Sequence, residues 1–199
     1  MSAERLFRYL FAMAWGALPA LVLCLALLPW RRRRLHRLGL VSSPVREGML
    51  LLFWMFCGAM AILTLFPRWV VPSLVDVWNG YRWNAGEYPF FTMGTVSLTP
   101  FGTLYDPFIF LGNVVMFLPF GFLVPLLWRR TGWGSALLLG VCITFFVESC
   151  QLLVGRAFDV DDLMLNALGV LAGYGIWRLW RRLAPDWACC LWCRETNEM

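Results

Sequence analysis

Residues 156–173 read Arg156-Ala-Phe-Asp159-Val-Asp161-Asp162-Leu-Met-Leu-Asn166-Ala-Leu-Gly169-Val-Leu-Ala-Gly173. Acidic and amide side chains thus begin an apolar run long enough to be embedded in lipid, and Glu148 and Gln151 interrupt the run before it. An ionisable side chain at the centre of a membrane helix costs at least about 2.5–3.5 kcal/mol, so such residues indicate a functional site. The polar residues are therefore the candidates for function, and the apolar sequence is their scaffold.

The composition is that of an integral membrane protein. Of the 199 residues, 60% are hydrophobic and 15% are charged, which is outside the range of a soluble domain. Five apolar stretches reach the roughly 20 residues that a spanning helix needs. They are residues 6–30, 48–66, 107–128, 133–154 and 160–180. The predicted fold is all-α, a polytopic membrane helical bundle with about five transmembrane helices.

The arginines predict the orientation of these helices, because loops on the cytoplasmic side carry an excess of basic residues. Residues 31–34 are all arginine, residues 129–130 are an arginine pair, and Arg178, Arg181 and Arg182 lie at the end of the last span. This pattern puts the N-terminus outside and the C-terminus inside, although Arg5 and Arg8 favour the opposite for the first helix.

We expect three regions along the chain. Residues 1–95 hold two transmembrane helices, an arginine-rich cytoplasmic loop and an aromatic outer loop; residues 96–182 form a three-helix region; residues 183–199 form a cytoplasmic tail. The outer loop, roughly residues 67–106, has no obvious periodicity. Loops of this length are usually functional or interfacial, and an interfacial flap is favoured here over a ligand platform.

Several kinds of chemistry are excluded by composition. All 17 basic residues are arginine, so no Schiff-base or phosphate-loop lysine exists. The only histidine, His36, lies among the loop arginines, so neither a histidine metal centre nor a Ser-His triad can form. No metal or cofactor is expected, and membrane contact explains the net charge of +5 without nucleic acid. Cys189, Cys190 and Cys193 are interpreted as reduced thiols of the tail.

The polar residues converge if the last two helices form an antiparallel hairpin, which their short connection at residues 155–158 predicts. Counting outward from Ala157 puts Glu148 level with Asn166, and Gln151 level with Asp162, on the outer-leaflet side. Helical spacing also makes one stripe of Asp159, Asp162, Asn166, Gly169 and Gly173.

The third predicted helix adds Asn113 at a similar depth, before a break expected at Pro119-Phe-Gly121. We therefore expect a net-acidic pocket open to the outside. Its candidate ligand-binding residues are Asn113, Glu148, Gln151, Arg156, Asp159, Asp162 and Asn166.

Structural roles are alternatives for these residues. Asp159 can cap the last helix, and Asp161 or Asp162 can favour its positive N-terminal end. Asn113 and Asn166 can form interhelical hydrogen bonds. No capping role fits Glu148, for which an ion pair with Arg156 is the structural alternative, and Gly169 and Gly173 are expected to serve packing.

The order of motifs resembles the VanZ-like family, which is named for a teicoplanin-resistance protein. The matching text is Ser97-Leu-Thr-Pro100-Phe101, Gly112-Asn113-Val-Val-Met-Phe117-Leu-Pro119-Phe-Gly121, Glu148-Ser-Cys-Gln151 and the quoted stretch from Arg156 to Gly173. The resemblance implies a multi-pass protein of the bacterial plasma membrane linked to the cell envelope and to low-level teicoplanin resistance. It implies no known reaction.

Three functions compete. The favoured one is binding of a polar headgroup, a lipid-linked envelope precursor or a lipoglycopeptide in the outer-leaflet pocket. The second is a membrane-embedded enzyme in which Glu148 and Asp162 act as acid and base on a lipid or cell-wall substrate. The third is an ion-coupled carrier, which the lack of an internal repeat and of acids near the cytoplasmic side disfavours. Whether the chain is an enzyme, and its oligomeric state, stay open.

Overall fold

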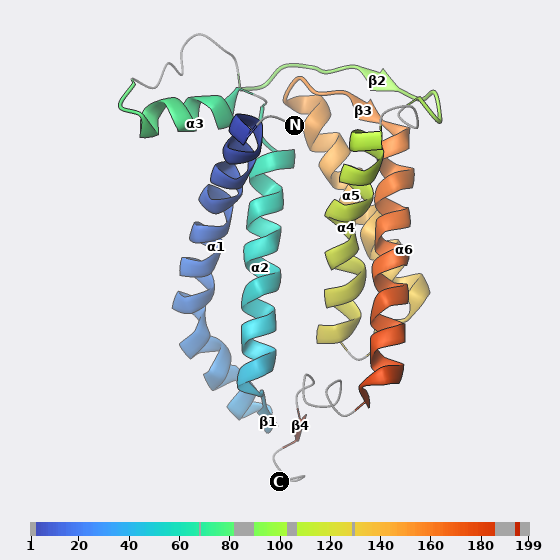
Figure 1. Cartoon of the computed structure of the whole chain (residues 1–199). Coiled ribbons are helices and arrows are strands. Elements are labelled where there is room, and N and C mark those ends of the chain that lie inside the picture. The colour runs from blue at the N-terminus through green and yellow to red at the C-terminus, as the bar shows by residue number, and fades with distance from the viewer. Residues whose placement is uncertain are drawn as a thin grey trace. The chain divides into compact units, whose positions relative to one another are not determined.

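The computed structural model describes residues 3–67, 69–81, 90–102, 107–128, 130–185 and 194–195. Six helices occur in these ranges: α1 (Ala3–Arg37), α2 (Pro44–Thr64), α3 (Val70–Trp78), α4 (Pro107–Leu127), α5 (Trp133–Leu153) and α6 (Val160–Leu183) (Figure 1). Four two-residue strands accompany them: β1 (Leu40–Val41), β2 (Val96–Ser97), β3 (Phe158–Asp159) and β4 (Arg194–Glu195). The predicted all-α membrane fold is confirmed.

Four helices of the described chain are long and apolar enough to cross a membrane, namely α1, α2, α4 and α5. They correspond to the first four predicted spans. The fifth predicted span is the 24-residue helix α6, which has the required length but is not among these four. Its polar residues, including Asp161, Asp162, Asn166 and Arg178, reduce its mean hydropathy. A membrane crossing by α6, and the N-out orientation, therefore stay predictions.

Two helices differ from their predictions, α1 in its extent and α4 in the absence of a break. α1 continues through the arginine run to Arg37, because arginine is a good helix former and the next terminator is Gly39 at φ 65°. α4 passes through Pro119 and Pro125 without ending, so the break expected at Pro119 is wrong. Neighbouring packing can support a proline inside a membrane helix, and Gly121 supplies such packing here.

The outer loop contains regular structure that its sequence did not reveal. α3 forms a nine-residue helix within it, and the ring of Trp78 at the end of α3 lies 5.6 Å from that of Phe11 in α1. Further along, the Thr92 and Gly94 N–H groups donate to the Leu153 and Leu152 carbonyls at 3.0 and 2.7 Å. The description of this loop as lacking periodic structure is therefore wrong for these segments.

The contacts divide the chain into two compact units whose segments alternate along the sequence. Unit 1 comprises Met1–Ala26, Leu52–Ser97 and Val147–Phe158. Unit 2 comprises Leu27–Leu51, Leu98–Phe146 and Asp159–Met199. The sequence-based division at residues 95 and 182 follows the predicted spans and loops and not the contacts, and it stays a prediction.

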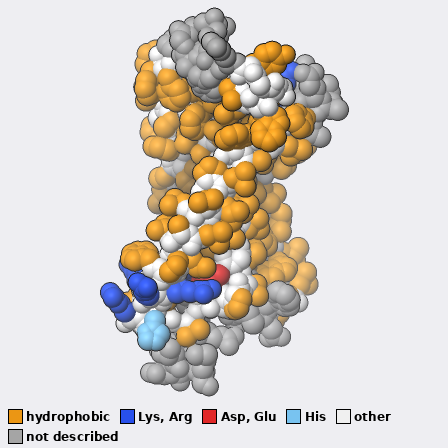
Figure 2. Space-filling model, turned by 90° about the vertical axis from the view of Figure 1, so that its left-hand side faces the viewer, with side chains coloured by type: hydrophobic (Ala, Val, Ile, Leu, Met, Phe, Trp, Pro, Cys, Tyr) orange, Lys and Arg blue, Asp and Glu red, His pale blue; other side chains and the backbone are white. Residues whose placement is uncertain are grey.

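In unit 1, α1 and α2 meet at two glycines. A Cβ atom on Gly58 would overlap the Gly16 carbonyl oxygen, and one on Gly16 would overlap that of Gly58. Small residues allow this close backbone approach between apolar helices. The other side of α1 is exposed and largely hydrophobic, as Leu10, Leu18 and Val22 illustrate (Figure 2). An apolar exposed surface of this kind suits contact with lipid.

In unit 2, α4 and α6 lie side by side in the same direction (Figure 1). Gly169 lies against Val114, and Gly173 lies against Leu118. The two contacts are therefore separated by four residues on each helix. The nearest atoms are backbone carbonyls, which leaves no room for a Cβ atom at either glycine. The expectation that these two glycines serve packing is confirmed.

The strands add two small pairings. β1 pairs antiparallel with β4 in unit 2, with Leu40 opposite Glu195 and Val41 opposite Arg194. β2 pairs with β3, and beside β2 the Phe158 N–H donates to the Thr95 carbonyl at 2.8 Å within unit 1.

Candidate functional site

The acidic start of α6 is organised by Asp159. This residue is the N-cap of α6, in extended conformation, and its Oδ1 accepts a hydrogen bond from the Asp161 N–H at 3.0 Å. An N-cap of this kind satisfies one backbone donor that the first helical turn leaves without a partner. The capping alternative for Asp159 is therefore confirmed, and a ligand-binding role for it stays a prediction.

Asp162 faces α4. The Asn113 side-chain amide on α4 donates a hydrogen bond to Asp162 Oδ1, and both side chains are half-buried. The structural alternative for Asn113, a hydrogen bond between helices, is confirmed. A hydrogen bond from an amide restricts the orientation of a carboxylate, which prepares the carboxylate to accept a donor from a ligand.

Asn166 lies one helical turn beyond Asp162 on the same face of α6. Its side chain is 3% exposed, and its Oδ1 accepts no hydrogen bond from any residue that the structure describes. Buried polar atoms in proteins nearly always have a hydrogen-bond partner, so a missing partner requires an explanation. A donor on a ligand or on water would satisfy this oxygen. We refer to Asn113, Asp162 and Asn166 as the acid–amide cluster.

Asp161 has a role that the helical stripe did not predict. It is 4% exposed, and its Oδ1 accepts from the Phe101 backbone N–H at 2.6 Å. Phe101 has φ 71°, a left-handed conformation that a non-glycine residue rarely adopts. Asp161 thus anchors the segment before α4 in a strained turn. The sequence carried a signal for this role. Two adjacent acids, Asp161 and Asp162, begin the helix, and only one of them can lie on the predicted stripe.

Glu148 and Gln151 belong to unit 1 and lie on the buried face of α5, at 1% and 4% exposure. The Gln151 backbone carbonyl accepts from the N–H groups of Val154 and Arg156 at 3.1 and 2.9 Å. Gly155 between them has φ 76°, which ends the helix in a left-handed turn. The short connection expected between the last two helices is therefore a tight turn.

Arg156 contacts the end of α2. Its Nη1 donates to the Leu63 and Thr64 carbonyls at 2.9 and 3.4 Å, within unit 1. The last carbonyls of a helix have no partner inside the helix, and a basic side chain is a favourable donor to them. This contact gives Arg156 a structural role that sequence reasoning missed, because residues 63 and 156 are far apart in the chain.

The predicted site residues thus fall into two groups. Asn113, Asp162 and Asn166 share unit 2, whereas Glu148 and Gln151 lie in unit 1 with Arg156. The predicted pairs Glu148–Asn166 and Gln151–Asp162 each join one unit to the other, and they stay predictions. Residues 189, 190 and 193, the cysteines of the tail, lie outside the described residues.

No set of three or more His, Cys, Asp or Glu side chains in the described ranges is placed to hold a metal ion. The cluster offers carboxylate and amide oxygens beside apolar side chains. Such groups bind hydrogen-bond donors, including hydroxyl, amide and ammonium groups.

The VanZ/LLP1 family model matches residues 53–181, well over half of the chain. The chain belongs to the VanZ/LLP1 family. The match contains the whole acid–amide cluster together with Glu148, Gln151 and Arg156, and it begins upstream of the motifs that carried the resemblance. No curated protein and no solved structure matches this VanZ/LLP1 chain.

Proposed function

We propose that this VanZ/LLP1 protein binds the polar headgroup of a lipid-linked cell-envelope molecule through its acid–amide cluster. The observation that carries the proposal is the buried Asn166 Oδ1, which has no hydrogen-bond partner among the described residues. A buried acceptor left without a donor costs roughly 1–3 kcal/mol, so a ligand that supplies the donor gains comparable affinity.

The chemistry of the cluster selects the headgroup. Asp162 and Asn166 present oxygens that accept hydrogen bonds, and Asn113 orients Asp162. A complementary ligand therefore offers several donors, such as sugar hydroxyls, amide N–H groups or an ammonium group. Envelope precursors and glycopeptides carry such donors at high density.

Exposed apolar side chains on the outward faces of the same two helices favour an amphiphilic ligand. Leu111 and Val115 on α4 are 59% and 54% exposed, and Met164 and Leu168 on α6 are 45% and 46% exposed. An acyl chain can lie against these side chains while the headgroup reaches the polar residues. A lipid-anchored ligand fits this combination better than a water-soluble one, because burial of its chain adds about 0.8 kcal/mol per CH₂.

This binding mode connects the family to teicoplanin, whose acyl chain distinguishes it from unacylated glycopeptides. In the proposed setting the chain is a multi-pass protein of the bacterial plasma membrane, with the acid–amide cluster on the outer-leaflet side. Capture of the acylated drug or of the precursor that it targets then reduces the effective dose.

The test compares Asn166→Leu with the parent protein in a teicoplanin-sensitive bacterium. Leucine keeps the volume of the side chain but accepts no hydrogen bond. We expect equal protein abundance, about a tenfold loss of affinity for the co-purifying lipid, and loss of protection against teicoplanin. Leu179→Ala, at a position of the same helix that is 58% exposed and has no part in the proposed site, is the matched control and retains both properties.

Two results would overturn the proposal. One is an Asn166→Leu variant that accumulates normally, protects as well as the parent and carries the same lipids by mass spectrometry. The other is equal protection by the parent against teicoplanin and an unacylated glycopeptide, which would reject the lipid-linked ligand. A Glu148→Gln variant assayed in parallel addresses the acid–base role raised by the sequence, since full activity of this neutral isostere excludes that role.

A further inference from the structure

A second charged feature begins at the C-terminal end of α1 and does not involve the acids of α6. Between residues 31 and 46 the chain has six arginines: Arg31, Arg32, Arg33, Arg34, Arg37 and Arg46. By the rule that cytoplasmic loops are rich in basic residues, these arginines indicate only how a membrane helix is oriented. The contacts and helical positions within unit 2 separate five of them into two groups with different roles, and Arg32 belongs to neither group.

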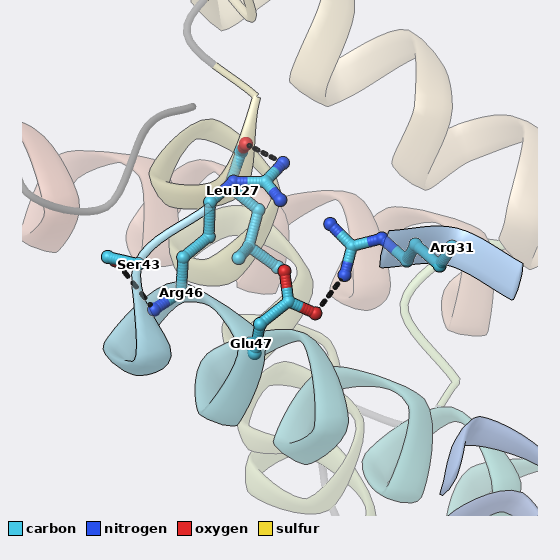
Figure 3. Close-up of polar contacts among 5 residues, drawn as sticks. All are labelled: Arg31, Ser43, Arg46, Glu47 and Leu127. Atoms are coloured by element: carbon cyan, nitrogen blue, oxygen red, sulfur yellow. Dashed lines mark hydrogen bonds and ion pairs between the residues drawn. The ribbon is translucent and has the colours of Figure 1, made fainter. Parts of the chain in front are cut away.

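Two of the six are engaged within the fold (Figure 3). Arg31 forms an ion pair with Glu47, and the backbone N–H of Arg46 donates to Ser43 Oγ at 3.2 Å. The Arg46 side chain is 8% exposed and its Nη2 donates to the Leu127 carbonyl at 3.4 Å, at the end of α4. These two arginines hold helix ends together through Glu47 and the Leu127 carbonyl.

Three others share one exposed face of α1. Trp30, Arg33, Arg34 and Arg37 follow the spacing i, i+3, i+4 and i+7, which places them on one side of the helix. All four side chains are exposed, and the Arg34 guanidinium lies 5.5 Å from the centre of the Trp30 ring. Within the described part of the chain, these arginines form no ion pair. We name these four residues the arginine face.

The arginine face continues directly from the apolar part of α1. The candidate span runs over Phe7–Arg37, so the arginines follow the hydrophobic residues without a loop. In Figure 2, most of the visible basic side chains gather with the histidine in the lower part of the view, below most of the hydrophobic side chains. A tryptophan and a set of arginines at the end of a spanning helix lie at the depth of lipid phosphates.

We propose that the arginine face binds the headgroups of anionic phospholipids, of the phosphatidylglycerol class, in the adjoining leaflet. The planar guanidinium matches a phosphate group with two parallel hydrogen bonds, which lysine cannot form. The use of arginine at all 17 basic positions agrees with phosphate recognition. Trp30 holds Arg34 beside the acyl boundary, so both parts of a lipid are contacted together. This site is separate from the acid–amide cluster and does not depend on it.

The experiment uses the full chain, delipidated in a neutral detergent, and native mass spectrometry with added phosphatidylglycerol or phosphatidylcholine of the same acyl composition. Each juxtamembrane arginine adds about 1 kcal/mol of attraction to an anionic surface, so the parent should prefer phosphatidylglycerol by about tenfold or more. In the triple variant Arg33→Gln, Arg34→Gln and Arg37→Gln, the preference should fall to about twofold or less.

The matched control removes the same charge elsewhere in unit 2. Arg178, Arg181 and Arg182 are exposed near the end of α6, and Arg181 also lies over a tryptophan ring, that of Trp177, at 5.4 Å. Replacement of these three by glutamine should leave most of the preference intact. Equal losses in both triple variants would overturn the proposal, because net charge alone would then explain the binding.

Two further measurements keep the test decisive if the first triple variant fails to accumulate. The preference of the parent should weaken as ammonium acetate rises from about 0.1 to 1 M, since the screening length falls from about 10 to 3 Å. A preference unchanged by salt overturns the proposal. Displacement of the lipid by a short DNA duplex, or by water-soluble glycerol phosphate at equal concentration, also overturns it by assigning the face to another partner.

Discussion

Asn113 on α4 donates its side-chain amide to the carboxylate of Asp162 on α6, and the two residues are 49 positions apart in the sequence. This hydrogen bond joins two helices that run in the same direction, and it lies just before the glycines at which their backbones meet. The candidate site and the packing of the helix pair therefore share a structural basis.

The Asn113–Asp162 bond should be measurable as a coupling energy. We expect Asn113→Ala and Asp162→Ala to be non-additive, with a coupling of about 0.6–1.7 kcal/mol, the range for hydrogen bonds between membrane helices. A double-mutant cycle on unfolding in mixed micelles measures it. Leu111→Ala, exposed on α4, is the control. Additivity of the two changes within about 0.3 kcal/mol would mean that the bond contributes nothing to stability.

The glycines of α6 should respond in opposite ways to alanine. Gly169→Ala and Gly173→Ala place a Cβ against the backbone of α4, and each should lower the free energy of unfolding by roughly 1–3 kcal/mol. Gly175→Ala meets no atom within 4 Å and should raise it by about 0.5–1 kcal/mol through helix propensity. Equal effects at the three positions would contradict the close contact of α4 with α6.

Exchange of charge tests the ion pair in Figure 3. Arg31→Glu and Glu47→Arg should each destabilise the protein, and the double variant should recover part of the loss because the pair is restored in reverse. The side chains are 29% and 17% exposed, so the recovery should be about 1 kcal/mol or less. Thermal unfolding in detergent measures it, and no recovery in the double variant would reject a specific pair.

The left-handed turn at Phe101 leads to a further prediction. Phe101→Gly should be more stable than Phe101→Ala by about 1 kcal/mol, because only glycine adopts φ 71° without a Cβ penalty. Both variants remove the same exposed ring, so their difference isolates the backbone. Far-UV circular dichroism during chemical unfolding provides the comparison, and equal stabilities would show that the residue leaves this conformation at no cost.

Features that depend on neighbouring residues in the chain could be predicted from the sequence. Apolar runs identified the long helices, helical spacing aligned Asp162 with Asn166, and an aspartate before an apolar run identified the cap at Asp159. These signals act within one or two helical turns, where the sequence order and the spatial order agree.

Features that depend on tertiary packing could not be predicted. The hydrogen bond of Asp162 with Asn113 on α4, and that of Arg156 with the end of α2, join residues far apart in the sequence, and no local pattern indicates them. Asp161 lies off the predicted stripe, yet its carboxylate accepts a hydrogen bond from the Phe101 N–H of a distant segment. α3 could not be identified either, because its nine residues are too few to establish a helical period in the sequence.

The parallel contact of α4 and α6 also has an electrostatic consequence. Peptide dipoles in two adjacent parallel helices point the same way, so their partial charges add at each end and repel one another. The carboxylates of Asp161 and Asp162 lie at the positive end of this pair, and Arg46 donates to the Leu127 carbonyl at the negative end. The helix pair thus carries compensating charges of opposite sign at its two ends, which offset the repulsion between its parallel dipoles.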